Sequence, residues 1–174
     1  MNLIIIKKAT ISDLQTIQEI SKQTFMETFA DVNTSEDMEN YVLENFNTEQ
    51  VASEINNRES AFYLATLGNE TIGYLKLNFG KAQTETYEEQ TMEIQRIYVL
   101  KAFLGKKIGQ LLLDEALKIA QQTAVDYIWL GVWEENGRAL QFYAKNGFVE
   151  FDKHNFTLGN DVQTDLLLKR QMNK

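Results

Sequence analysis

The chain has 174 residues, of which 44% are hydrophobic and 24% are charged, so we expect residues 1–174 to form a single globular domain. Its formal net charge of −8 argues against nucleic acid or an anionic membrane as the main partner and is compatible with a cationic ligand. The absence of cysteine and the presence of one histidine, His154, exclude disulfides, a cysteine nucleophile and a multi-histidine metal site, and we expect no metal. The apolar run at residues 3–6 is too short for a signal peptide or a membrane span, so we expect a cytoplasmic protein.

The first third of the chain predicts one strand and three helices. Residues 3–8 have the composition of a strand, and Thr10 and Asp13 then have the spacing of a capping box that opens a helix. Helical spacing predicts that this helix turns one stripe of side chains inward, made of Leu14, Ile17, Ile20, Thr24 and Thr28. Two acidic helices are predicted next, at residues 36–45 and 48–57.

The end of the first helix has the unusual sequence T-F-M-E-T-F, which places Phe25 and Phe29 one turn apart and Glu27 on another face. One interpretation is that the two aromatic rings fill the core while Glu27 points to water. The other is that the three side chains form an aromatic and acidic wall for a cationic amine.

The remaining strands are predicted at residues 61–67, 71–79, 92–99, 127–133, 148–155 and 162–169, and two further helices at 108–123 and 136–146. Gly68-Asn69 is a two-residue hairpin signal, and the polar stretch 80–90 predicts a loop. Residues 127–133 are almost continuously apolar, as expected of a strand that is covered on both faces. Gly147 is placed to end the last helix. The pattern predicts an α/β domain built around a mixed sheet.

A glycine-bearing turn at residues 104–109 joins the strand from Met92 to Val99 to the helix that begins at Ile108. Such a turn presents free backbone N–H groups to one spot, with the positive end of the helix dipole behind them. It therefore predicts a phosphate site, or else an ordinary corner with a lysine-rich surface.

Two segments carry motifs. Leu104 to Gly109 has the sequence L-G-K-K-I-G, and residues 136–148 have the sequence N-G-R-A-L-Q-F-Y-A-K-N-G-F. They resemble the Q/R-x-x-G-x-G/A acyl-CoA motif and the N-x-x-A-x-x-F-Y-x-K-x-G-F signature of the GNAT (Gcn5-related) N-acetyltransferases. Leu104 and Lys107 depart from the first motif, where Gln or Arg and the first Gly are usual. The resemblance covers essentially the whole chain and is greatest to the PaiA-type polyamine N-acetyltransferases, including the segments 24–29, 72–78, 96–99, 130–136 and 154–165.

This resemblance implies the GNAT fold, with a mostly antiparallel sheet of six to seven strands and about four to five helices. Acyl-CoA would bind where the strand from Met92 to Val99 splays from the strand Tyr127–Trp133. The implied reaction is direct transfer of an acetyl group from acetyl-CoA to a small-molecule primary amine such as spermidine or spermine, without a covalent enzyme intermediate. A homodimer is common in the family, but the sequence carries no interface signal for one.

The resemblance also implies residue roles. A primary amine with a pKa near 10.4 must lose a proton at a cost of roughly 4–5 kcal/mol at neutral pH, so a base is needed. Glu93 is our candidate base, with Glu27 as its competitor, and Tyr143 is the candidate acid for the CoA thiolate. A strand N–H freed by a bulge near Tyr98 or Val99 could bind the carbonyl oxygen. The expected acceptor-binding residues are Phe25, Glu27, Phe29, Tyr74 and Lys76. The expected acyl-CoA-binding residues are Ile97, Tyr98, Val99, Leu104, Gly105, Lys106, Lys107, Ile108, Gly109, Asn136, Ala139, Phe142, Tyr143 and Lys145.

Each of these residues could instead have a purely structural role. Tyr143 could be a packing aromatic, Glu93 a solvated strand carboxylate and Asn136 a helix cap alone. His154, alone in a terminal strand, is more often structural than catalytic. Two other functions also remain open: a GNAT enzyme that acts on a protein N-terminus or another small amine, and a non-catalytic acyl-CoA-binding regulatory module. The departures at Leu104 and Lys107 favour the second of these.

Overall fold

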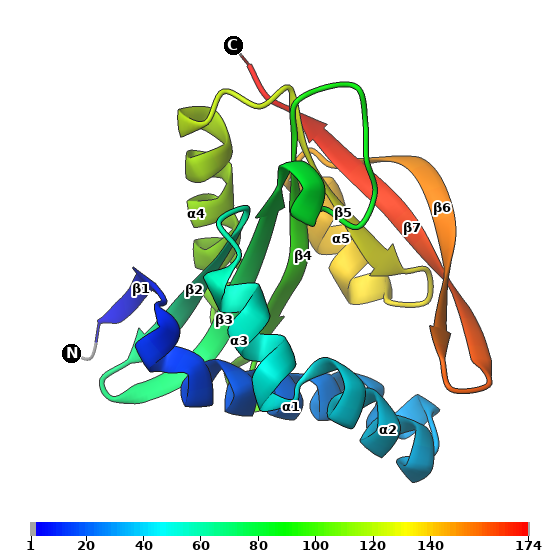
Figure 1. Cartoon of the computed structure of the whole chain (residues 1–174). Coiled ribbons are helices and arrows are strands. Elements are labelled where there is room, and N and C mark those ends of the chain that lie inside the picture. Colours follow the sequence, from blue (N-terminus) through cyan, green and yellow to red (C-terminus); the bar gives the residue numbers. More distant parts are fainter. Residues whose placement is uncertain (1–2, 174) are drawn as a thin grey trace.

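A seven-stranded sheet organises the chain, in the order β1-β2-β3-β4-β5-β7-β6 (Figure 1). The computed structural model describes residues 3–173. The strands are β1 (Ile4–Lys8), β2 (Ser60–Leu67), β3 (Glu70–Phe79), β4 (Thr91–Val99), β5 (Tyr127–Trp133), β6 (Val149–Leu158) and β7 (Asp161–Gln171). The α-helices are α1 (Leu14–Phe29), α2 (Ser35–Asn45), α3 (Thr48–Asn56), α4 (Ile108–Gln122) and α5 (Gly137–Lys145). All neighbouring strands are antiparallel except β4 and β5, which confirms the predicted mixed, mostly antiparallel sheet.

The helices divide between the two faces of the sheet, as Figure 1 shows. On one face, the apolar stripe of α4, with Ile108, Leu112 and Ala116, packs with β3, β4 and β5 in the main core, to which Tyr143 of α5 also belongs. On the other face, α1, α2 and α3 pack over β2 and β3 in a second core. None of the helices in the described residues is long and apolar enough to cross a bilayer.

The decisive feature of the topology is the short pairing of β4 with β5. These parallel strands pair only through Thr91↔Tyr127, Met92↔Ile128 and Glu93↔Trp129. Beyond that point β4 stays paired with β3 as far as Val99, and β5 stays paired with β7 as far as Trp133. The two strands therefore diverge after Glu93, which forms the predicted splay and leaves one backbone edge of each strand without a strand partner.

Most local signals in the sequence correspond to what the structure contains. Thr10 and Asp13 form the predicted capping box, although a short 3-10 turn precedes α1. Gly147 follows α5 with a φ of +82°, as expected of a glycine after a helix end. The last two strands are longer than predicted, because a tight turn at Gly159 joins them into one extended hairpin.

The predicted inward stripe of α1 was wrong at its last position. Thr28 is exposed, and its hydroxyl donates a hydrogen bond to the carbonyl of Thr24. Phe25 and Phe29 are buried instead, because the helix turns these larger apolar rings toward α2 and the second core. The rings stack with or tilt against Tyr41 and each other, with centroids 4.3 Å apart for Phe25–Tyr41 and 5.0 Å for Phe25–Phe29.

A substitution at Gly73 of β3 tests how closely β3 packs against β4. A Cβ atom at this position would lie 2.8 Å from the backbone oxygen of Tyr98, which cannot move without disturbing the sheet. We expect Gly73→Ala to lower the free energy of unfolding by about 1–3 kcal/mol in urea denaturation, as overpacking commonly does. Gly137→Ala is the matched control, since a Cβ there meets nothing within 4 Å. Equal stabilities of the two variants would contradict the prediction.

Candidate active site

The turn at residues 104–109 starts α4 at the open end of the splay. Gly105 has a φ of +79°, and Lys107 is also left-handed, with φ 65° and ψ 13°. Lys107 therefore takes the backbone conformation that glycine favours, at a cost of about 1–2 kcal/mol. Lys106 and Lys107 are exposed, and the N–H groups that begin α4 have no partner within the helix. Lys107, which stands where the acyl-CoA motif usually has glycine, thus keeps the left-handed backbone conformation that a glycine would adopt there.

The start of α5 lies next to this turn. Asn136 caps α5, and its Oδ1 accepts a hydrogen bond from the N–H of Ala139 at 3.2 Å. A Cβ at Gly109 would lie 4.0 Å from Cζ of Phe142, an ordinary van der Waals distance, so the first turn of α4 lies beside α5. A Cβ at Gly105 would lie 3.8 Å from a guanidinium nitrogen of Arg138, a residue that sequence reasoning missed. The sequence did contain a signal for Arg138, because this basic residue lies in the first turn of the helix that carries the second motif.

Tyr143 of α5 is buried, with 6% of its surface exposed. Its ring packs edge-on against Phe142 and Phe148, at centroid distances of 5.2 and 5.6 Å. Burial raises the pKa of the Tyr143 phenol. Burial also raises the pKa of Tyr98 on β4, and the neighbouring phenols of Tyr74, Tyr41 and Tyr143 add to this rise. Tyr98 and Tyr143 are thus within electrostatic range of each other, although one comes from β4 and the other from the helix after β5.

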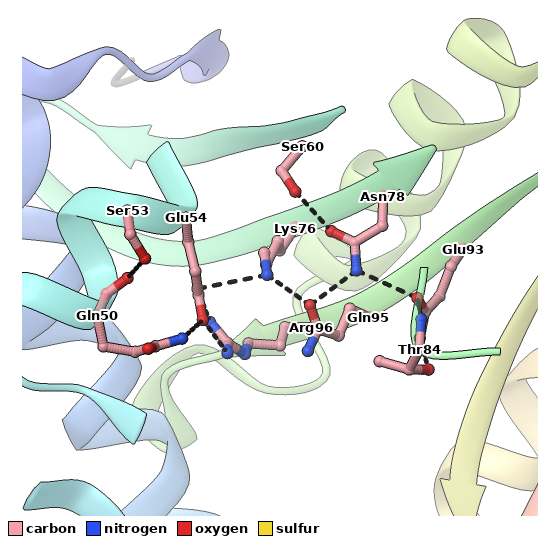
Figure 2. Close-up of polar contacts among 10 residues, drawn as sticks. All are labelled: Gln50, Ser53, Glu54, Ser60, Lys76, Asn78, Thr84, Glu93, Gln95 and Arg96. Carbon is pink, nitrogen blue, oxygen red and sulfur yellow. Dashed lines mark hydrogen bonds and ion pairs between the residues drawn. The ribbon is translucent and has the colours of Figure 1, made fainter. Parts of the chain in front are cut away.

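A polar network lies on the face of the sheet that α1, α2 and α3 cover, opposite α4. It extends from α3 across β3 to β4 (Figure 2). Arg96 donates two hydrogen bonds to the Glu54 carboxylate, at 2.8 and 3.0 Å, and Lys76 lies 3.4 Å from the same carboxylate. Burial alone would raise the pKa of Glu54, but the hydrogen bonds and charge of Arg96 outweigh it and hold that pKa below its ordinary value. Within residues 3–173, no three His, Asp or Glu side chains gather as a metal site would require.

Glu93 lies at the last paired position of β4 and β5, and only 3% of its surface is exposed. Its carboxylate accepts hydrogen bonds from the Thr84 N–H at 2.8 Å, the Thr84 hydroxyl at 2.6 Å and the Asn78 amide at 3.1 Å. Glu93 is therefore held at the apex of the splay and is no solvated strand carboxylate. The loop between β3 and β4, which supplies Thr84, covers it.

A bulge in β4 follows Glu93 directly. The register passes from Leu77↔Ile94 to Lys76↔Arg96, so Gln95 is the extra residue. The prediction that a bulge near Tyr98 or Val99 frees a strand N–H was therefore wrong in position. The bulge allows two successive side chains, Gln95 and Arg96, to join the same polar network (Figure 2).

The expected acceptor-binding residues are mostly covered. Phe25 and Phe29 pack in the second core, and Tyr74 is 1% exposed. Lys76 is 5% exposed and is held by Glu54 and Gln95. Glu27 is half-buried and accepts a hydrogen bond from the backbone N–H of Lys101 at 2.7 Å, which ties α1 to the segment after β4. For the phenylalanines this arrangement favours the core-packing interpretation.

The left-handed Lys107 leads to a stability prediction. Glycine should relieve the strain that any L side chain suffers there, so we expect Lys107→Gly to be about 1 kcal/mol more stable than Lys107→Ala. The alanine variant is the matched control, because both variants lose the same charge. Thermal unfolding of the pair measures the difference, and an alanine variant that equals the glycine variant would contradict the left-handed geometry.

Lys76 leads to a pH prediction. Burial and then the charge of Arg96 lower the pKa of Lys76 from 10.5 to about 8. Above about pH 8 the unfolded chain therefore binds more protons at this site than the folded chain, so the free energy of unfolding rises with pH, by up to about 1.4 kcal/mol per unit. Urea denaturation up to about pH 9.5, below the ordinary titration of tyrosine, should show this slope in the native chain and not in Lys76→Met. Equal slopes in both proteins would contradict the depressed pKa.

Comparison with known proteins places this geometry in a family. Residues 15–148 match the model of the Acetyltransferase (GNAT) family. The chain is 38% identical over 160 residues to an uncharacterized N-acetyltransferase of Lactobacillus delbrueckii subsp. lactis, with 92% of each chain covered. It is 30% identical over 147 residues to the spermidine N(1)-acetyltransferase of Thermoplasma acidophilum, with 82% of this chain and 86% of that protein covered. The crystal structure of the PaiA N-acetyltransferase of T. acidophilum in complex with coenzyme A has a TM-score of 0.79 at 28% identity, covering 98% of this chain and 99% of that one. The chain therefore belongs to the GNAT acetyltransferase family and is an acetyl-CoA-dependent N-acetyltransferase.

Proposed function

We propose that the enzyme transfers the acetyl group of acetyl-CoA to a primary amine of a polyamine such as spermidine or spermine, by direct attack. The observation that carries this proposal is the splay after Glu93, which has two helix starts on one side and a buried carboxylate at its apex. The similarity to a spermidine N(1)-acetyltransferase supports the choice of acceptor. The chain has no cysteine that could carry an acyl group, in keeping with a direct transfer.

The residues at the two helix starts suit the phosphate-bearing end of acetyl-CoA. The N–H groups at Gly105 to Gly109 and the positive end of α4 would bind the pyrophosphate, and the exposed Lys106 and Lys107 complement its charge. The free edge of β4 at Ile97, Tyr98 and Val99 can pair with the amides of the pantetheine arm. The other expected contacts are Leu104 and Ile108 of the turn, and Asn136, Ala139, Phe142 and Lys145 at α5. Bound acetyl-CoA supplies the activated thioester.

Tyr143 is our proposed donor to the sulfur of the leaving thiolate. A phenol at its ordinary pKa near 10 and a thiol near 8.5 make full proton transfer uphill by about 2 kcal/mol, and the raised pKa of Tyr143 increases this cost. A hydroxyl that stays protonated is well suited to donate a hydrogen bond to developing negative charge. We therefore assign Tyr143 the stabilisation of the thiolate by a hydrogen bond.

Glu93 is our proposed acceptor of the amine proton. Its hydrogen bonds from Thr84 and Asn78 fix the carboxylate at the apex of the splay, where a nucleophile must approach the acyl group. The competing candidate, Glu27, binds a backbone N–H near the far end of β4. Its half-buried position supports contact with the entering amine.

Removal of the Tyr143 hydroxyl tests its role. Tyr143→Phe should lower kcat by about 100-fold and leave CoA affinity within about twofold, because the hydroxyl acts on the leaving group. Tyr87→Phe is the matched control, since this phenol lies in the loop between β3 and β4, against Trp129 and Phe151. Thiol release and CoA titration measure the two quantities, and an unchanged kcat in Tyr143→Phe would end the assignment.

The acceptor is tested by thiol release from acetyl-CoA with a panel of spermidine, spermine, simple monoamines and peptides with a free N-terminus. The proposal expects the highest kcat/KM with the polyamines. A preference for peptides would favour an enzyme that acts on protein N-termini. Tight CoA binding without turnover of any amine would favour the non-catalytic regulatory module.

A further inference from the structure

His154 of β6 stands between two carboxylates. Its Nδ1 lies 3.1 Å from Oε1 of Glu85, in the loop between β3 and β4, and its Nε2 lies 3.6 Å from Oδ2 of Asp165 on β7. His154 and Asp165 are directly opposed in the β6–β7 ladder. Glu85 and His154 are partly exposed, with 42% and 31% of their side-chain surface accessible. The ring thus connects a loop carboxylate to a strand carboxylate.

Asp165 lies beside the part of β5 that is no longer paired with β4. It pairs with Trp133, beyond the last β4–β5 pair at Trp129, and its carboxylate leans over Gly131. A Cβ at Gly131 would lie 3.5 Å from Oδ2 of Asp165, an ordinary van der Waals contact, so this carboxylate lies directly over Gly131. Asp165 shares this face of the sheet with Leu167 and with the side chain of Trp129. Asp165 therefore lies on the same side of the splay as Glu93, with 18% of its side chain exposed.

Two of the other carboxylates near the splay are bound by protein groups, because Glu54 holds Arg96 through both oxygens and Glu27 binds the N–H of Lys101. Glu93 accepts two hydrogen bonds at Oε2 and one at Oε1, which leaves Oε1 a further acceptor site for the reactive amine. Within residues 3–173, the polar partner of the Asp165 side chain is His154, which it meets through Oδ2. Its Oδ1 is left to receive a ligand. Burial raises the pKa of Asp165 while the charge of His154 opposes this rise, so a second cation beside the carboxylate would be favourable.

The spacing suits a ligand with two cationic groups. Glu93 on β4 is level with Trp129, and Asp165 on β7 reaches the level of Gly131, two residues further along β5. The separation is about 7 Å along β5 and two strand spacings, about 10 Å, across it, which is roughly 12 Å in all. A single ammonium group cannot contact both carboxylates across that distance, but the two terminal amines of an extended polyamine can. Tyr41 of α2 is within electrostatic range of Asp165, and its ring lies 6.0 Å from that of Phe156, two residues beyond His154 on β6. Both rings are only partly buried, so they leave apolar surface on which the methylene chain can pack.

We propose that Asp165, positioned by His154 and Glu85, binds the second ammonium group of a polyamine whose reactive amine lies at Glu93. This inference rests on the proposed function and assigns the distal-amine subsite of that acceptor. In the reaction the ammonium at Glu93 gives up one proton and its nitrogen forms a bond to the acetyl carbon. The carbon–sulfur bond breaks with its electron pair on sulfur, and the second nitrogen proton leaves to give the CoA thiol. The distal ammonium at Asp165 keeps its protons throughout.

The test compares spermidine with butylamine, which has one amine, in steady-state thiol release. Asp165→Asn should raise the KM for spermidine by about tenfold, as expected for the loss of a charge-assisted hydrogen bond, with kcat little changed. The kcat/KM for butylamine should stay within about twofold, because this amine never reaches Asp165. His154→Gln should produce a smaller rise in the same KM alone, and Asp165→Glu should restore part of the affinity.

Glu150→Gln is the matched control, because it removes the same charge from an exposed site on β6 that is opposite Leu168. Melting temperatures of all variants check that they are folded. Equal losses for spermidine and butylamine in Asp165→Asn, or no loss with either, would overturn the subsite while leaving amine acetylation intact. A native enzyme that acetylates neither amine would overturn the proposed function first, and the subsite with it.

Discussion

The structure depends on one constraint, which is that β4 and β5 are each held by a different neighbour. β4 stays paired with β3 as far as Val99 and β5 stays paired with β7 as far as Trp133, whereas the central parallel pairing ends after Glu93. An edge of backbone inside a sheet is normally costly, because N–H and C=O groups lose their partners. Here the same edge becomes a place where an extended ligand can supply the missing partners.

The two faces of β4 serve this arrangement in different ways. Met92, Ile94 and Ile97 pack into the core beneath α4, which fixes the strand and the helix start relative to each other. The other face carries the ion pairs of Arg96 and Lys76 with Glu54. Both cations share the Glu54 carboxylate, which offsets part of the cost of burying them, and the lowered pKa of Lys76 shows that a cost remains. The network makes the face rigid beneath the carboxylate at the apex.

Elements with strong local patterns could be predicted from the sequence, and features that depend on contacts between distant residues could not. The apolar run Tyr127–Trp133 and the capping box at Thr10 were recognisable because periodicity and capping are local properties. The bulge at Gln95 depends on the register of β3, which the sequence of β4 does not contain. The left-handed Lys107 was hidden because lysine carries no signal for that conformation. The contact of His154 with Glu85 joins residues 69 positions apart, which no spacing rule reaches.

The loop between β3 and β4 has a consequence for how such enzymes can diverge. It is anchored to β4 and β5 through Gln83, which accepts hydrogen bonds from Thr91 and Trp129, and to β6 through Glu85. Surface loops usually tolerate insertions and deletions among homologues. Here a change of a single residue in length between β3 and Gln83 would shift Thr84 relative to Glu93 and Glu85 relative to His154 together. Relatives that keep these anchors should therefore vary residues 80–85 at constant length, and a lineage in which this segment is longer or shorter should have rebuilt its acceptor cleft.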